Sequence, residues 1–334
     1  MTTVSIPHTD VAGEPFPAAR FIKEIGRGKN GARSMTRDDA RALYRAMLEG
    51  RVSDLELGGI LLAMRIKGES VDEIAGFLDA AEASFVPVAA PSREHASGFA
   101  PIIIPSYNGA RKMANLTALL ALLLARAGAP VLVHGVTSDP GRVTTAEVLA
   151  ALGVPASLDH AQAEAAMARG AVAFLPIDAL APRLAHMLSL RRVLGVRNCT
   201  HTLVKIMQPF AGPALRLVSY THPEYLEMLG EYFLTASDPA RGDAFLMRGT
   251  EGETVANANK AQQIDWFHGA ERTVLVEKQL LVASLSDLPA ERDAATTAAW
   301  IAAVLRGEMP VPPSIAEQVE QCLMASRQIA SRPR

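Results

Sequence analysis

Hydrophobic and polar positions along residues 20–85 follow a helical rhythm. Three hydroxyl residues, Thr36, Ser53 and Ser70, each stand three positions before an acidic residue at the start of an apolar-periodic stretch. Such a hydroxyl accepts a hydrogen bond from a free N–H group of the first helical turn, and the acid suits the positive end of the helix dipole. The pattern predicts a small all-helical N-terminal domain.

After Pro91 the rhythm changes to short apolar runs separated by helical stretches. Alternation of this kind is typical of a largely parallel sheet covered by helices. Ligands bind such folds outside the carboxyl ends of the strands, so the loops after the apolar runs are the places to search. The runs are Ile102–Ile104, Val131–Val133, Ala171–Leu175, Leu215–Val218, Phe245–Met247 and Val274–Val276, and the early helices are Asn115–Ala127 and Thr144–Leu152.

These two patterns divide the chain, whose 334 residues are many for a single hydrophobic core. We expect an α/β protein with two domains. The small helical domain of residues 20–85 is joined by residues of about 182–212, and the large α/β domain comprises residues 90–181 and 213–334. Residues 1–19, with three prolines and little periodicity, predict an extended arm.

Composition adds exclusions. Hydrophobic residues make up 49% of the chain and charged residues 20%, which are globular values, and the net charge of −2 excludes a protein that is basic throughout. Cys199 and Cys322 are too isolated for a metal-ligand or redox pair and fit a reducing compartment. We find no signal segment, and the longest apolar run, Leu116–Ala125, is too short to cross a bilayer. We therefore expect a cytoplasmic protein without membrane contact.

Positive charge is nevertheless concentrated in a few segments. No acidic residue occurs between Glu94 and Asp139 or between Asp178 and Glu224, and the stretch Arg20–Arg51 carries nine Lys or Arg against four Asp or Glu. Exposed helices normally carry both positive and negative charges, so a solvated helix surface is a poor explanation of the two acid-free spans. For the stretch Arg20–Arg51, a solvated surface and a functional role are equally good explanations. Where the spans meet in the fold, they would form a positive groove that attracts phosphates.

The sharpest local feature is the loop that follows the first apolar run. Asn108 and Gly109 supply a turn whose backbone N–H groups can face an anion, and Arg111 and Lys112 add positive charge. Tyr107 would stack on a base or pack at the domain junction. An ordinary strand-to-helix turn explains Asn-Gly equally well, so the loop favours anion binding mainly through its Arg-Lys pair.

Several of these segments resemble a known family, the anthranilate phosphoribosyltransferases. Leu61–Ser70 is similar to the helical domain of that family. Val133–Gly135 and the helix after it resemble its KHGNR segment, and Leu194–Arg197 resembles its LG-x-R element. The resemblance covers roughly residues 20–280 and implies the scaffold of that family.

The catalytic positions of the family are changed in this chain. Where the family has a GTGGD loop that grips pyrophosphate, Gly109 stands in the place of the acid. Asn115 and His134 remain family-like, but Val133 stands where the family has a lysine. Of the acidic pair that holds magnesium in the family, only Glu253 is left here, as a possible lone acid. Magnesium needs hard oxygen ligands. The comparison therefore implies no transfer to anthranilate, no metal and no cofactor.

The replacements resemble the YbiB-type branch of the same superfamily, through the segments Tyr107–Lys112, Gly26–Arg33 and Arg248–Gly252. Members of that branch are homodimers that bind nucleic acid with little sequence preference through a basic groove. The resemblance therefore implies a non-catalytic nucleic-acid-binding homodimer, acting on single-stranded DNA or RNA, and it agrees with the charge distribution. The expected phosphate contacts are Arg111, Lys112, Arg197, Lys205 and Arg248, with Lys260 and Lys278 as weaker candidates.

Two other hypotheses stay open. One is an enzyme of the same superfamily with a changed substrate, in which His134, Arg197 and His201 orient a small anion and magnesium is bound. For His134, a hydrogen bond to a neighbouring loop is the simpler interpretation. The other is a purely structural partner-binding protein. The resemblance also implies dimerisation through the helical domain. Four residues of this domain form either the apolar face for that contact or part of the internal core: Leu57, Ile60, Leu61 and Met64.

Overall fold

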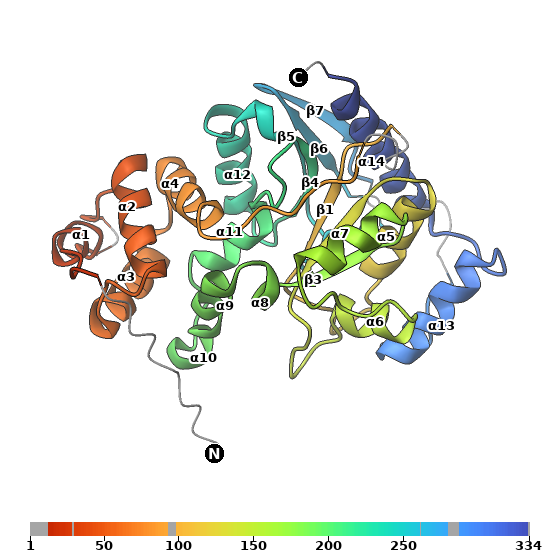
Figure 1. The fold of residues 1–334 in the computed structure, drawn as a ribbon, viewed down its shortest axis with the longest axis horizontal. Coiled ribbons are helices and arrows are strands. Elements are labelled where there is room, and N and C mark those ends of the chain that lie inside the picture. The colour runs from red at the N-terminus through yellow and green to blue at the C-terminus, as the bar shows by residue number, and fades with distance from the viewer. Residues whose placement is uncertain (1–12, 29, 93–97, 261, 280–286, 333–334) are drawn as a thin grey trace. The chain divides into compact units, whose positions relative to one another are not determined.

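The computed structural model describes residues 13–28, 30–92, 98–260, 262–279 and 287–332. It divides into a helical unit, Met1–Phe85 with Arg183–Leu203, and an α/β unit, Val86–Pro182 with Val204–Arg334 (Figure 1). Residues 204–212, which we expected in the helical unit, group with the α/β unit, where Val88 and Phe210 form a β-bridge. Of the expected arm, residues 1–12 lie outside the described residues.

Capped helices build the helical unit. Thr36, Ser53 and Ser70 each accept a hydrogen bond from the backbone N–H three residues on, as the sequence predicts, and the two serines complete capping boxes. The Tyr44 hydroxyl lies 2.7 Å from the Thr200 hydroxyl, so the two chain segments of this unit share a core. The helices are α1 (Ala19–Ile25), α2 (Arg37–Leu48), α3 (Asp54–Lys67), α4 (Val71–Glu82), α9 (Pro182–Ser189), α10 (Arg191–Leu194) and α11 (Thr200–Ile206), which runs across the unit boundary.

One seven-stranded sheet organises the α/β unit, in the order β3-β2-β1-β4-β5-β6-β7 (Figure 1). The first five strands pair in parallel, and β6 and β7 add an antiparallel edge. This is the mostly parallel α/β architecture that the sequence predicts. The strands are β1 (Ile102–Ser106), β2 (Val131–Gly135), β3 (Ala173–Pro176), β4 (Ala214–Ser219), β5 (Gly242–Met247), β6 (Ile264–His268) and β7 (Glu271–Val276).

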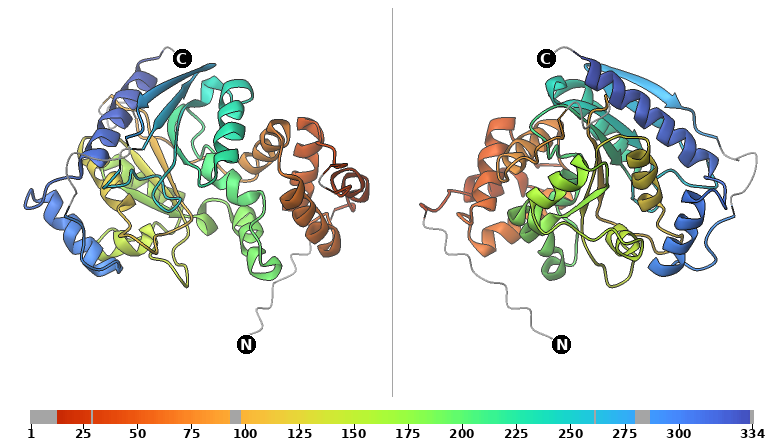
Figure 2. Two further views of the ribbon diagram at one scale, coloured as in Figure 1. Left: turned by 180° about the vertical axis from the view of Figure 1, so that it is seen from behind. Right: turned by 45° about the vertical axis from the view of Figure 1, so that its right-hand side comes forward.

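Helices cover this sheet. Alternate residues of the central strands, such as Ile102, Ile104 and Val133, share one buried cluster with residues of α5, α6, α13 and α14. Helix α14 packs against β4 and β5 (Figure 2), whereas α7 and α8 pack on β2 and β3, and α12 packs on β5 and β6. Among the described helices, none combines the length and the apolar character needed to span a bilayer. The helices of this unit are α5 (Thr117–Arg126), α6 (Thr145–Ala151), α7 (His160–Ala168), α8 (Ile177–Leu180), α12 (Pro223–Thr235), α13 (Ala294–Leu305) and α14 (Pro313–Ser331), with a short 3₁₀ turn at Pro239–Arg241.

The antiparallel edge differs from the expectation. The predicted strand at Val274–Val276 is the end of β7, and β6 was not predicted. Asp265 interrupts the apolar pattern of β6, yet it is only 2% exposed because Gln263 and Arg272 hydrogen-bond its carboxylate. Because Asp265 is buried with hydrogen-bond partners, the strand contains a charged residue where an apolar one is expected, and the sequence pattern does not identify it.

Candidate functional site

The loops that follow the parallel strands meet at one edge of the sheet. Strands β1, β4 and β5 are parallel, so the segments after Ser106, Ser219 and Met247 leave the sheet at that edge. Because β6 and β7 are antiparallel, β6 starts and β7 ends there as well. Folds of this kind bind ligands at this edge.

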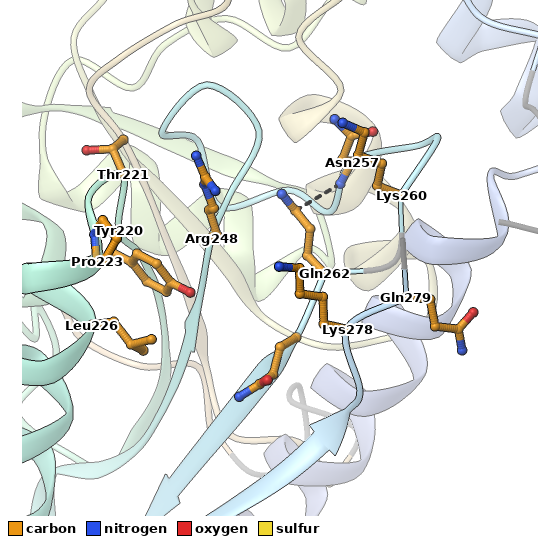
Figure 3. Close-up of a pocket in the computed structure, with 11 residues that line it drawn as sticks. Tyr220, Thr221, Pro223, Leu226, Arg248, Asn257, Lys260, Gln262, Lys278 and Gln279 are labelled. Carbon is orange, nitrogen blue, oxygen red and sulfur yellow. Dashed lines mark hydrogen bonds between the residues drawn. The ribbon is translucent and has the colours of Figure 1, made fainter. Parts of the chain in front are cut away.

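A cavity of about 680 Å³, which we call the basic pocket, lies at this edge within the α/β unit. Arg248 lines it from the end of β5, Lys260 from the segment before β6, and Lys278 from the end of β7. Tyr220 lines it from the end of β4, and Figure 3 shows these side chains around one space. The structure thus brings together three of the residues predicted to contact phosphates.

The basic pocket holds positive charge without a compensating acid. Arg248, Lys260 and Lys278 are exposed, and within the part of the chain that the structure describes none of them has an ion-pair partner. The described lining residues include no Asp or Glu. Burial raises the pKa of Tyr220, Asp265 adds to the rise and Arg248 opposes it, so the phenol is neutral at neutral pH. A neutral aromatic ring beside three cations suits a ligand that carries both bases and phosphates.

The backbone N–H groups of the loop of residues 105–112 bind carboxylates of the chain itself. The N–H groups of Asn108 and Gly109 donate to Glu253 Oε1 at 2.8 and 2.7 Å. The Lys112 N–H donates to Glu251 Oε1 at 2.7 Å, and the Arg111 N–H donates to Glu251 Oε2. We expected these groups to face an external anion, and that expectation was wrong. Two acids from the loop after β5 already occupy them.

A left-handed turn delivers the two carboxylates. Glu251 has a φ of 54° and Gly252 a φ of 90°, a region that disfavours side chains and suits glycine. A Cβ at Gly252 would lie 1.6 Å from Asn108 Nδ2. Lys205 Nζ and Ser219 Oγ donate to the Gly252 carbonyl at 3.1 and 2.7 Å. The turn is therefore fixed to the sheet edge, and Lys205, a predicted phosphate contact, helps to hold it.

The family-like polar residues behind this loop contact one another or their neighbours. The Tyr107 hydroxyl lies 2.7 Å from His134 Nδ1, so the ring packs against the histidine. Burial raises the pKa of Tyr107 and lowers the pKa of His134 to about 3, which keeps both side chains neutral. Asn115 Nδ2 donates to the Val143 carbonyl and the Thr145 hydroxyl, both at 3.1 Å. These contacts fix the loop in place.

The remaining predicted contacts lie apart from the pocket lining. The side chains of Arg111 and Lys112 are exposed on the loop after β1, and the Arg111 carbonyl accepts a hydrogen bond from Arg292 at 3.2 Å. Arg197 belongs to the helical unit, where it is half-buried and has interactions of its own.

The basic stretch Arg20–Arg51 is largely paired with neighbouring acids. Arg27 lies 2.6 Å from Glu24, and Arg45 lies 2.8 Å from Glu49. The same holds for Arg20, Arg33, Arg37, Arg41 and Arg51. This stretch is an ion-paired helical surface, the simpler of its two interpretations.

The loop does not fit a magnesium site. Within the described ranges, no group of three or more His, Cys, Asp or Glu side chains is placed to hold a metal ion. Both oxygens of Glu251 and Oε1 of Glu253 already accept amide hydrogen bonds. Because magnesium requires oxygen ligands that are free to coordinate it, we derive no chemistry through this metal.

Comparison with known proteins defines the class. Residues 19–84 match the sequence model described as glycosyl transferase family, helical bundle domain, and residues 108–324 match the one described as glycosyl transferase family, a/b domain. The chain therefore belongs to this glycosyl transferase family.

Individual relatives narrow the comparison. The chain is 46% identical over 313 residues to the uncharacterized protein YbiB of Escherichia coli, which covers 93% of this chain and 95% of that protein. It is 32% identical over 211 residues to the anthranilate phosphoribosyltransferase of Beijerinckia indica, covering 63% of this chain and 58% of that one. The crystal structure of the enzyme of the same name from Thermus thermophilus matches with a TM-score of 0.70 at 22% identity, over 95% of this chain and 89% of that one. The scaffold is thus like that of anthranilate phosphoribosyltransferases.

Sequence reasoning missed two groups at this edge. One is Tyr220, which directly follows the apolar run of β4. The rule that ligands bind beyond the ends of strands could have identified it. The other is the side-chain amide of Gln262, which also lines the pocket. It was missed because it precedes β6, a strand that the sequence pattern did not predict.

Proposed function

We propose that this protein binds single-stranded nucleic acid, without catalysis, through the basic pocket. The observation that carries the proposal is the convergence of Arg248, Lys260 and Lys278 on one cavity beside Tyr220. Cations without acidic partners attract backbone phosphates. An aromatic ring stacks on any base, and base faces are accessible in a single strand but covered in a duplex. The combination favours a sequence-tolerant single-strand site.

The exposed side chains of Arg111 and Lys112 supply further phosphate contacts at the same sheet edge. Lys205 contributes less to binding, because its Nζ donates to the Gly252 carbonyl. Arg197, which belongs to the helical unit, is a further expected phosphate contact.

The test is a salt titration. Changing Arg248, Lys260 and Lys278 together to alanine should weaken binding of a labelled oligothymidylate. Each phosphate contact contributes about 0.7 to the slope of log K against log salt for a single strand, so loss of three should flatten the slope by about 2. Fluorescence anisotropy between about 0.05 and 0.3 M salt measures both quantities.

A matched control removes three exposed cations elsewhere, Lys23, Arg41 and Arg169. The control variant should keep the wild-type slope, because it loses the same charge outside the basic pocket. Equal slopes for the two triple variants, or wild-type protein that binds no strand at low salt, would reject the proposal.

A second candidate function is transfer by a phosphoribosyltransferase-type enzyme with a changed substrate, which the similarity to a protein named anthranilate phosphoribosyltransferase favours. Calorimetry with phosphoribosyl pyrophosphate and magnesium separates the two functions. Saturable, magnesium-dependent binding would support the transferase, and heat of dilution alone would support the nucleic-acid-binding protein.

We also propose that two copies associate through the helical unit. Of the two interpretations of Leu57, Ile60, Leu61 and Met64, internal core holds for the last three, which are at most 1% exposed. The opposite side of α3 instead exposes Leu55, Leu62 and Ile66, which define the α3 stripe. Residues spaced by seven and four share one helix face, and a two-fold axis would let this apolar face cover itself.

A further inference from the structure

Four backbone N–H groups of the loop of residues 105–112 point at two carboxylates, and this arrangement resembles a ligand-binding site that is already full. Successive amides with such convergence form a concavity that binds anions. Here the anions are Glu251 and Glu253, from a segment more than 130 residues further along the chain. The contact is therefore tertiary and depends on the fold.

We propose that the backbone amides of Asn108, Gly109, Arg111 and Lys112 form an anion site that the protein fills with its own Glu251 and Glu253 carboxylates, which closes the site to free phosphate and pyrophosphate. This inference is independent of nucleic-acid binding, because the basic pocket uses side-chain cations, whereas the closed site uses backbone amides.

The turn that carries the carboxylates is shaped for this contact. Glu251 adopts a left-handed φ that disfavours a side chain, and Gly252 fits where any Cβ would overlap Asn108. The Asn108 side chain also donates to the Glu251 carbonyl at 3.2 Å. An arrangement that keeps a glutamate in a disfavoured conformation indicates that its carboxylate contributes to the stability of the turn.

The two glutamates differ in depth. Glu253 is 1% exposed, and no described residue hydrogen-bonds its Oε2. Glu251 is half-buried, and its oxygens accept from the N–H groups of the exposed residues Arg111 and Lys112. Removing Glu251 would open the outer half of the site, next to two cationic side chains, while Glu253 still holds the inner half of the loop.

The experiment uses Glu251→Ala in the full-length protein. Inorganic pyrophosphate is titrated at low ionic strength, and binding is measured by calorimetry and by the backbone amide signals of Arg111 and Lys112. We expect pyrophosphate to bind about tenfold or more tightly to the variant than to the wild type, because charge-assisted hydrogen bonds to an anion become available. The two amide signals should shift on binding.

Glu320→Ala is the matched control, since it removes one exposed acid from α14 and should bind pyrophosphate as the wild type does. Glu251→Gly removes the same carboxylate while suiting the left-handed conformation, so it tests the idea even if the alanine variant folds poorly. The proposal is overturned if the folded glycine variant gains no affinity. It is also overturned if the wild type binds pyrophosphate as tightly as the variant does, or if the gained binding shifts other amides and leaves those of Arg111 and Lys112 unmoved.

Discussion

Tyr220 is the aromatic residue among the described residues that line the basic pocket, and its ring is half-buried there. Base stacking on an aromatic ring contributes about 1–3 kcal/mol, so Tyr220→Ala should weaken oligothymidylate binding by roughly tenfold or more. The salt slope should stay nearly unchanged, because no cation is removed. Tyr220→Phe keeps the ring and should bind like the wild type. A phenylalanine variant as weak as the alanine variant would mean that the hydroxyl, and not stacking, is what matters.

His134 makes a second prediction at the residue scale, on pH and stability. Burial lowers its pKa to about 3, whereas in the unfolded chain the imidazole titrates near its ordinary value of about 6.5. Between about pH 3 and 6.5 the unfolded chain binds a proton at this imidazole and the folded protein does not. The free energy of unfolding is therefore highest above about pH 6.5 and decreases as the pH falls. The contribution is about 1.4 kcal/mol of unfolding free energy per pH unit.

Urea unfolding of the wild type and of His134→Gln, between about pH 6 and 4.5, measures this slope. The variant should lose less stability per pH unit than the wild type, whatever its stability at pH 7. His222→Gln removes an exposed histidine and should retain the wild-type slope. Parallel slopes for the wild type and His134→Gln would contradict the assignment of a buried neutral imidazole.

At the scale of elements, the sequence predicts those features whose interacting residues are close together in the chain. The caps of α2, α3 and α4 were predictable because a hydroxyl and the N–H three residues on define each one. The turn at Glu251 was not, since its partners lie near Asn108, and a local pattern holds no information about so distant a contact. The loop of residues 105–112 lies in an acid-free span of the sequence, yet two acids from elsewhere in the chain bind its backbone amides.

Strand β6 shows a second reason for a missed element. Asp265 of β6 and Asp243 of the adjacent strand β5 are only 2% and 1% exposed, and they pair with Arg272 and Arg332 respectively. Period-two hydrophobicity identifies a strand only where polar residues face water. The pocket residues Lys260 and Lys278 flank the hairpin of β6 and β7.

At the scale of the whole molecule, the near-neutral net charge of −2 conceals an uneven distribution. The arginines of Arg20–Arg51 are paired, whereas Arg183, Arg191 and Arg192 have no ion-pair partner within the described residues, like the three cations of the basic pocket. Unpaired cations occur in both units, which favours a polyanion that contacts the protein at several points. Such a ligand also benefits if two copies of the chain present their pockets together.

The α3 stripe gives the prediction at this scale. Leu55, Leu62 and Ile66 are 88%, 42% and 67% exposed, and covering them by a second copy removes apolar surface from water. Leu62→Glu should convert a dimer into monomers in sedimentation equilibrium, because it would place two like charges face to face across a two-fold axis. Leu158→Glu, at an isolated exposed position of the α/β unit, should leave the mass unchanged.

Strand length then links assembly to binding. A long strand that reaches both pockets of a dimer gains from the effective concentration of the second site, so monomerisation should weaken its binding by about 100-fold. A short oligonucleotide that fills one pocket should bind the Leu62→Glu variant as it binds the wild type. If sedimentation shows the wild type to be monomeric, the α3 stripe has a different role. If the dimer dissociates and long strands bind as before, each pocket acts alone.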